Sequence, residues 1–326
     1  MNSDYEGFEP SLLKPPGQQK VAPATENAKR TLDDLIARAL AYSSGPELKE
    51  LLDFSRRFPH YAPYNAMLLH VQNPGIRYAV RASVWEDTYE RRVNPGARPY
   101  VVLQTMGPVA FVFDISDTHP IDPSHDLVPA LVVNPFPTKG NAPPKAMKRL
   151  TDACAKVGIV VVTQDLGSNL AGDVRRAAVN GSEFHLRLNV KHTGAQQLGT
   201  LAHELAHVFC GHLGEDRAGI APDRPVRTLT PQVQEFEAEA VAYLVTDRLN
   251  LDVGSVAYLA GYISETKPIP GYSLDAVLKA AGKIEEMLQG RFRLKKDRER
   301  RTRVTQVSLT STHSQVAHRS LRGRQF

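Results

Sequence analysis

G-T-L-A-H-E-L-A-H-V-F-C-G-H, residues 199–212, is the most informative stretch of this chain. His203 and His207 are four residues apart, so on an α-helix they share one face. Two imidazoles at this spacing can hold one Zn²⁺, and Glu204 between them can reach water beside the ion. The motif therefore predicts zinc-dependent hydrolase chemistry. The simpler alternative is an amphipathic helix whose histidines only cap or fill.

Length and composition indicate a globular protein with a sizeable core. The chain has 326 residues, of which 42% are hydrophobic, and this length favours two domains plus tails. Residues 1–10 lack the basic and apolar regions of a signal peptide, and no apolar run approaches the length of a membrane span. Cys154 and Cys210 form no metal-binding or disulfide pattern. We therefore expect a soluble, cytoplasmic protein that does not associate with membranes.

Changes in composition divide the chain into five predicted parts. They are a disordered leader (1–29), an α+β domain (30–120), a proline-rich linker (121–145), a second domain (146–290) and a basic, disordered tail (291–326). The tail holds eleven Lys and Arg against two acidic residues, a charge of +9 within a net charge of +5, which leaves −4 for the rest. Such a tail is either a phosphate-binding segment or simply solvated.

The expected fold class is α+β. In the first domain, a helix that begins at residue 31 and helices over 46–58 and 65–71 precede strands at 78–80, 100–104 and 109–115, with a helical turn at 82–87 between the first two strands. The second domain is expected to be mainly helical with a small sheet. Its predicted helices cover 146–157, the motif region, 230–250, 253–265 and 273–288, and its predicted strands cover 159–163 and 183–189.

Basic and aromatic residues alternate in the second half of the first domain. The candidates for contact with nucleic acid are Arg81, Trp85, Arg91, Arg92 and Arg98. Arginines that contact phosphates, beside aromatic rings that stack on bases, are typical of single-stranded-DNA-binding proteins. The alternative is that the aromatic rings lie in the core and the arginines form a solvated rim.

Two histidines leave a catalytic zinc site one protein ligand short. Glu235, Glu237 and Glu239 lie on the next predicted helix. At about 100° per residue, Glu235 and Glu239 are separated by about 40° and share a face, whereas Glu237 points away. The pattern leaves the choice between Glu235 and Glu239 open; a surface cluster of acidic residues is the alternative to both.

The second domain resembles the ImmA/IrrE-type metallopeptidases. The resemblance rests on H-E-L-A-H at 203–207, followed 28 residues after His207 by E-F-E-A-E-A-V-A-Y-L at 235–244. It implies a zincin-like fold, a zinc ion held by His203, His207 and Glu235, and Glu204 as the general base. Glu239 is then either an alternative ligand or a residue that supports a ligand from behind.

The first domain is similar to the N-terminal single-stranded-DNA-binding domain of ArdC-type antirestriction proteins. The matching segments are Y-N-A-M-L-L-H-V-Q-N-P (64–74), V-W-E-D (84–87), V-N-P-G-A-R-P (93–99) and V-F-D-I-S-D (112–117). The resemblance implies single-stranded DNA as a partner.

Two functions follow from these patterns. The first is a zinc metalloendopeptidase that hydrolyses peptide bonds of a regulatory protein, with Tyr243 or His212 as a candidate donor to the oxyanion. The second is a single-stranded-DNA-binding antirestriction or mobile-element protein with weak or no proteolysis. The complete H-E-x-x-H motif favours the first, because a purely structural zinc site has no use for Glu204. Nothing in the sequence specifies an oligomeric state.

Overall fold

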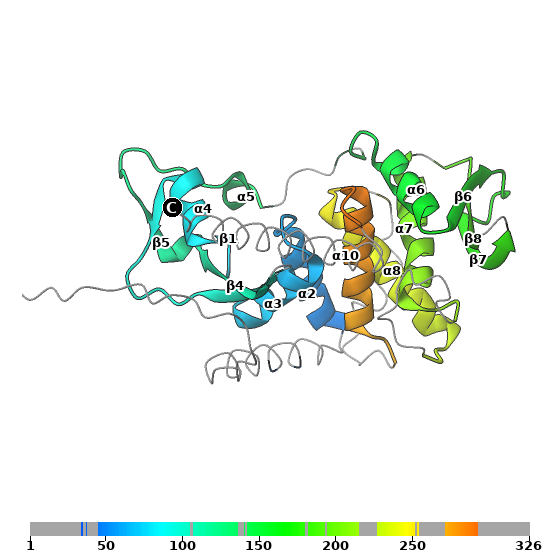
Figure 1. The fold of residues 1–326 in the computed structure, drawn as a ribbon, viewed down its shortest axis with the longest axis horizontal. Coiled ribbons are helices and arrows are strands. Elements are labelled where there is room, and N and C mark those ends of the chain that lie inside the picture. The colour runs from blue at the N-terminus through cyan, green and yellow to red at the C-terminus, as the bar shows by residue number, and fades with distance from the viewer. Residues whose placement is uncertain are drawn as a thin grey trace, which may run out of the picture.

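The computed structural model describes most of the chain between residues 45 and 292 (Figure 1). The described residues are 34, 37, 45–104, 107–135, 140, 142–179, 182–192, 194–214, 227–251, 253 and 271–292. The predicted leader, nearly all of the helix predicted from residue 31, the helix predicted at 253–265 apart from residue 253, and nearly all of the basic tail lie outside these residues.

Helices and short strands alternate along the described chain, in keeping with an α+β protein. The first half contains α2 (Gly45–Arg56), α3 (Pro63–Gln72), β1 (Ala79–Val80), α4 (Ala82–Tyr89), β2 (Arg91–Val93), β3 (Tyr100–Gln104), β4 (Gly107–Asp114), β5 (Thr118–Pro120) and α5 (Ala130–Val133). The second half contains α6 (Ala146–Lys156), β6 (Ile159–Gln164), β7 (Gly172–Val179), β8 (Ser182–Asn189), α7 (Gly194–Cys210), α8 (Pro231–Arg248) and α10 (Leu274–Leu288). None of the helices in these parts is both long and apolar enough to cross a bilayer.

The predicted helices and strands are found close to their expected positions, but three strands have no clear sequence signal. Strands β2 and β5 are only three residues long and pair with each other in antiparallel fashion. Strand β7, G-D-V-R-R-A-A-V, begins with two residues that are rare in strands and has two adjacent arginines in place of a regular alternation. It is nevertheless the strand closest to the candidate site described below.

The sheet of the N-terminal half has strand order β1-β4-β3, with antiparallel pairing throughout. Side-chain amides of α3 bind the backbone of strand β3. Gln72 accepts from Val101 N at 2.8 Å and donates to Val101 O at 2.9 Å. Asn65 accepts from Leu103 N at 2.8 Å and donates to Leu103 O at 3.1 Å. These hydrogen bonds satisfy backbone groups of β3 that could otherwise pair with another strand.

The sheet of the C-terminal half has strand order β6-β8-β7, with β6 parallel and β7 antiparallel to β8. Helix α6 precedes β6 in the chain and packs against β6 and α10, whereas α7 follows β8 and packs against both β7 and β8. Helices α8 and α10 lie on the side of α7 that is away from the sheet (Figure 1). Helix α7 is therefore held between a sheet and a helical layer.

One hydrophobic core extends across the predicted linker. Leu48 and Leu51 of α2 and Met67 of α3 belong to the same buried cluster as α7, α8 and α10. Arg248, at the end of α8, adds polar contacts: it pairs with Glu285 of α10 at 2.6 Å and donates to the carbonyl oxygen of Ser55 at 2.7 Å. Helices α2 and α3 thus precede the proline-rich segment in sequence but pack against the C-terminal helices.

Candidate metal centre

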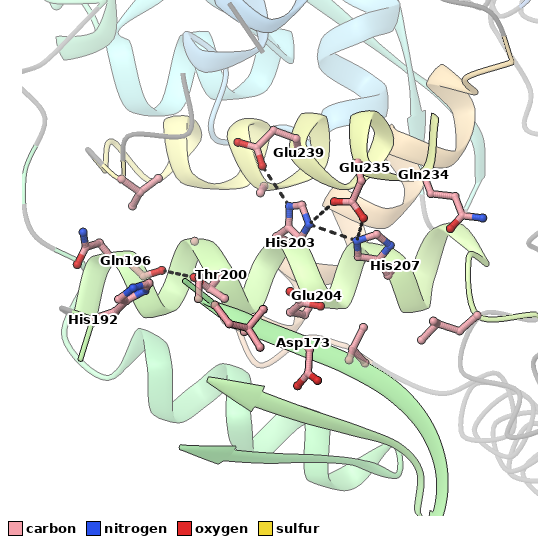
Figure 2. A pocket seen from close by; sticks show the side chains of 18 residues that line it. Asp173, His192, Gln196, Thr200, His203, Glu204, His207, Gln234, Glu235 and Glu239 are labelled. Carbon is pink, nitrogen blue, oxygen red and sulfur yellow. Dashed lines mark hydrogen bonds and ion pairs between the residues drawn. The ribbon is translucent and has the colours of Figure 1, made fainter. Parts of the chain in front are cut away.

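Helix α7 carries His203 and His207 on the face turned toward α8 (Figure 2). Leu201 and Leu205 of the same helix are fully buried in the core and fix its rotation. The Nε2 atoms of the two imidazoles are 3.2 Å apart, and the ring centroids are 5.0 Å apart. Both rings therefore direct Nε2 toward one point in front of α8.

Glu235 brings a carboxylate to this point from α8. Its two oxygens lie 3.3 Å from His203 Nε2 and 3.6 Å from His207 Nε2. One donor atom from each of the three residues lies within 4.8 Å of the others, a separation at which they could share a metal ion. The Glu235 side chain is 50% exposed, so it lies at the open side of the group.

Glu239, one turn later on α8, contacts the opposite edge of His203. Its Oε2 lies 3.1 Å from His203 Nδ1, and its side chain is 14% exposed. The helical angles predict that Glu235 and Glu239 share a face, and both indeed reach His203. Only Glu235 reaches the Nε2 atoms, so the geometry favours Glu235 as the third donor and Glu239 as the acceptor that orients His203.

The charges around His203 favour a cation. Burial by itself would lower the pKa of His203, but the hydrogen bonds with Glu235 and Glu239 outweigh it and raise the pKa to about 9. The pKa of His207 is lowered by burial and then by the neighbouring imidazoles of His203 and His212. The carboxylate groups of Glu235 and Glu239 therefore make the surroundings of His203 favourable to positive charge.

Glu204 lies between α7 and β7, on the side of the helix that faces Asp173 (Figure 2). The residue is 8% exposed. Burial raises the pKa of Glu204 to about 7, with His203 opposing the shift and Glu235 and Asp173 adding to it. Gly172 of β7 permits this close packing, because a Cβ there would lie 2.6 Å from Thr200 Cγ2, 2.8 Å from Arg187 O and 3.6 Å from Glu204 Cγ.

The side chains of His203, Glu204, His207, Glu235 and Glu239 all line one pocket of about 830 Å³. One wall is β7 with the residues just before it, another is α7, and the third is α8. Its lining residues are Leu170, Ala171, Gly172, Asp173, Val174, His192, Gln196, Gly199, Thr200, His203, Glu204, His207, Leu213, Gln234, Glu235, Glu239, Ala242 and Val253. The predicted oxyanion donors Tyr243 and His212 do not line this pocket. That prediction is wrong for His212, whose ring lies behind His207 and is 1% exposed.

Glu237 points away from the pocket, as the helical angles predict, and enters a buried polar cluster. It contacts His212 at 2.9 Å and forms two hydrogen bonds of 2.7 Å with Arg227. Burial alone would raise the pKa of Glu237, but the bonds from His212 and Arg227 outweigh it and lower the pKa. Cys210, His212 and Glu237 also have donor atoms within 4.8 Å of one another. A guanidinium on the same carboxylate opposes a second cation there, so this cluster is better described as support for His207.

Two of the five candidate DNA contacts are buried, which corrects that part of the sequence prediction. Trp85 is fully buried and donates its indole N–H to Phe113 O at 2.8 Å, so its ring is not available to stack on a base. Arg91 is 6% exposed and is held by Thr118 and Asp126. Arg81, Arg92 and Arg98 are exposed, and Arg92 lies 3.5 Å from Glu86. The aromatic residue expected to stack is instead a core residue.

Comparison with protein-family models gives one result for this region of the chain. Residues 154–252 match the Peptidase_M78 family model, described as the IrrE N-terminal-like domain. The match extends from the end of α6 through the sheet, α7 and α8, and so contains every residue of the candidate metal centre. It supports a metallopeptidase-like domain, and this family is typically metal-dependent.

The remaining comparisons add no relative. Neither the comparison with curated proteins nor that with solved structures gives a match. The family match includes none of residues 30–120, and the ArdC-like resemblance of that region receives no support from the comparisons.

Proposed function

We propose that this protein is a zinc-dependent metalloendopeptidase in which His203, His207 and Glu235 hold the metal and Glu204 acts as the general base. The observation that carries the proposal is the convergence of two imidazole nitrogens and a carboxylate in a pocket that also holds the buried Glu204 carboxyl group. The family match to residues 154–252 supports the same class of chemistry.

The donor groups fit a zinc ion in type and spacing. Nitrogen and oxygen ligands bind zinc at about 2.0–2.2 Å in tetrahedral geometry, which corresponds to ligand atoms roughly 3.3–3.5 Å apart. The separations among His203 Nε2, His207 Nε2 and the Glu235 oxygens are 3.2, 3.3 and 3.6 Å. Three protein ligands leave one position open, as catalytic zinc sites require. When bound, the ion would polarise a peptide carbonyl and make water more acidic.

Glu204 is suited to move a proton at this position. Its carboxylate would take a proton from the attacking water and then donate it to the leaving amine. A group does both most effectively when its pKa lies near the working pH, and burial raises the pKa of Glu204 to about 7.

Strand β7 favours an extended peptide as substrate. It lies at one edge of the sheet, whose strand order is β6-β8-β7, and Gly172, Asp173 and Val174 line the pocket. An extended segment can pair with the backbone of such an edge, which places one of its peptide bonds over the site. A flexible segment within a folded regulatory protein is the substrate class we propose.

The decisive experiment compares wild type with Glu204→Gln and His203→Ala. Each full-length protein, loaded with zinc, is incubated with a mixed peptide library, and new termini are identified by mass spectrometry. We expect cleavage by wild type, zinc binding without cleavage by Glu204→Gln, and loss of both in His203→Ala. Cleavage by Glu204→Gln at the wild-type rate, or cleavage that persists in a chelator, would refute the proposal.

A further inference from the structure

A series of hydrogen bonds leads from the back of His207 into the core. His207 Nδ1 lies 2.9 Å from Nδ1 of His212, and Nε2 of His212 lies 2.9 Å from Oε2 of Glu237. The side chains of His212 and Glu237 are 1% and 0% exposed. Both ring nitrogens of His212 are thus engaged inside the protein, and neither faces the pocket.

Glu237 is fixed as a hydrogen-bond acceptor at the far end of this series. Arg227 donates to both of its oxygens at 2.7 Å, and the backbone N–H of Ser273 donates to Oε1 at 2.7 Å. A carboxylate held by a guanidinium and a backbone amide has only acceptor sites to offer. The remaining partner, His212 Nε2, must therefore be the donor.

The position of each proton follows from this order. Because His212 has its proton on Nε2, its Nδ1 is an acceptor in the neutral ring. Nδ1 of His207 must then carry a proton and donate it to His212. This leaves His207 Nε2 without a proton, with its lone pair directed toward His203 and Glu235.

We propose that His212 is a positioning residue that holds His207 in the tautomer and ring orientation required to bind the metal through Nε2. Glu237 and Arg227 hold His212 in the matching tautomer. The inference rests on the proposed function, since it takes His207 as a metal ligand. In the opposite arrangement the proton of His207 would lie on Nε2, where it would block the metal, and the Glu237 carboxylate would face a bare nitrogen.

Zinc affinity of full-length variants, measured by competition with a chromophoric chelator, tests the proposal. His212→Leu should weaken zinc binding about 10- to 100-fold, the usual effect of losing such a supporting group. His212→Asn should stay within about threefold of wild type, because its amide oxygen can still accept the proton from His207 Nδ1. His185→Leu is the matched control; His185 lies on β8, outside the hydrogen-bond series, and the variant should bind zinc as wild type does.

A second measurement does not depend on any variant. Long-range ¹H–¹⁵N NMR spectra of the zinc-loaded wild type should show His207 protonated on Nδ1 and His212 protonated on Nε2. If His212 had only a structural role, His212→Leu would lower the unfolding midpoint of the metal-free protein but leave the zinc affinity of the folded fraction unchanged.

The outcomes separate this inference from the proposed function. Zinc binding that survives His207→Ala would overturn both. Binding that requires His207 but is unchanged in His212→Leu would overturn only the role of His212, as would a proton on Nδ1 of His212. Loss of a second zinc equivalent in His212→Leu would likewise overturn it, because His212 would then be a ligand itself.

Discussion

At the scale of single residues, the two imidazoles of the candidate metal centre are supported in different ways. Behind His203 lies a carboxylate, Glu239, at 3.1 Å, and behind His207 lies another imidazole, His212, at 2.9 Å. A carboxylate accepts the proton of His203 directly, whereas His212 needs Glu237 to fix its own proton first. Glu235, Glu237 and Glu239 of α8 therefore have distinct roles, although each lies only two residues from the next.

Substitution of Glu235 and of Glu239 should therefore have unequal effects on metal binding. Glu239→Ala removes an orienting group, so we expect zinc affinity to fall about 10- to 100-fold. Glu235→Ala removes a donor to the ion itself and should cost more than this. Chelator competition on both variants, with one zinc per chain confirmed by elemental analysis, gives the ranking. A larger loss in Glu239→Ala would mean that Glu239, rather than Glu235, is the third ligand.

At the scale of elements, the site depends on how closely β7 approaches α7. Gly172 is where the two meet, because any side chain would press on Thr200 and on the backbone of Arg187. Asp173 follows it and forms an ion pair with Arg187 of β8, which fixes the register of the edge strand. The pKa of Asp173 is lowered, mainly by its hydrogen bond with Arg187. The strand thus forms a rigid wall beside Glu204.

Gly172→Ala should move this wall away from α7. The new Cβ would lie 2.8 Å from a backbone oxygen, so the strand must shift, and overpacking of this kind costs about 1–3 kcal/mol. We expect a lower free energy of unfolding in urea and reduced peptide cleavage, with zinc still bound by α7 and α8. Gly194→Ala is the control, since nothing lies within 4 Å of a Cβ there. Equal stability and activity in the two variants would show that β7 is not held against the helix in this way.

At the scale of the whole molecule, Arg248 connects the two halves of the chain. It pairs with Glu285 at 2.6 Å and donates to the carbonyls of Ser55, at 2.7 Å, and of Tyr61. Burial raises the pKa of Glu285, an effect that Arg248 opposes. The contacts of one guanidinium thus fix the end of α2 against α8 and α10, on the side of the core opposite the sheet.

Arg248→Met should destabilise the protein by about 3–5 kcal/mol, the range for removing one partner of a buried ion pair. Glu285 would then be buried without its counter-charge, so its folded-state pKa would rise further. A carboxyl group with a raised folded-state pKa costs stability as pH rises through the interval from its unfolded to its folded value. The deficit relative to wild type should therefore shrink as the pH falls from about 7 toward 5, as measured by urea unfolding at each pH. The double variant Arg248→Met/Glu285→Leu should recover much of the loss; no recovery would assign the loss to packing rather than to the charge.

The sequence by itself determined the chemistry that α7 offers. The spacing of His203 and His207 depends only on helical geometry, and so does the separation of Glu235 and Glu239 from Glu237. The same local rules predict most helices and strands, because each depends on neighbours within one or two turns. The α+β class and the candidate donors could therefore be predicted without knowledge of the fold.

Only the tertiary structure decided which groups meet. Glu235 and Glu239 are equivalent by helical angle. The packing of α8 on α7 separates them, because it places the Glu235 carboxylate beside Nε2 of His203 and the Glu239 carboxylate beside Nδ1 of the same ring. Trp85 and Arg91 have the composition of a nucleic-acid surface, yet packing buries both. The series from His207 through His212 to Glu237 and Arg227 joins residues from two helices and a loop. Such contacts depend on packing between elements that are far apart in the sequence, and the spacing of residues within one helix or strand does not specify that packing.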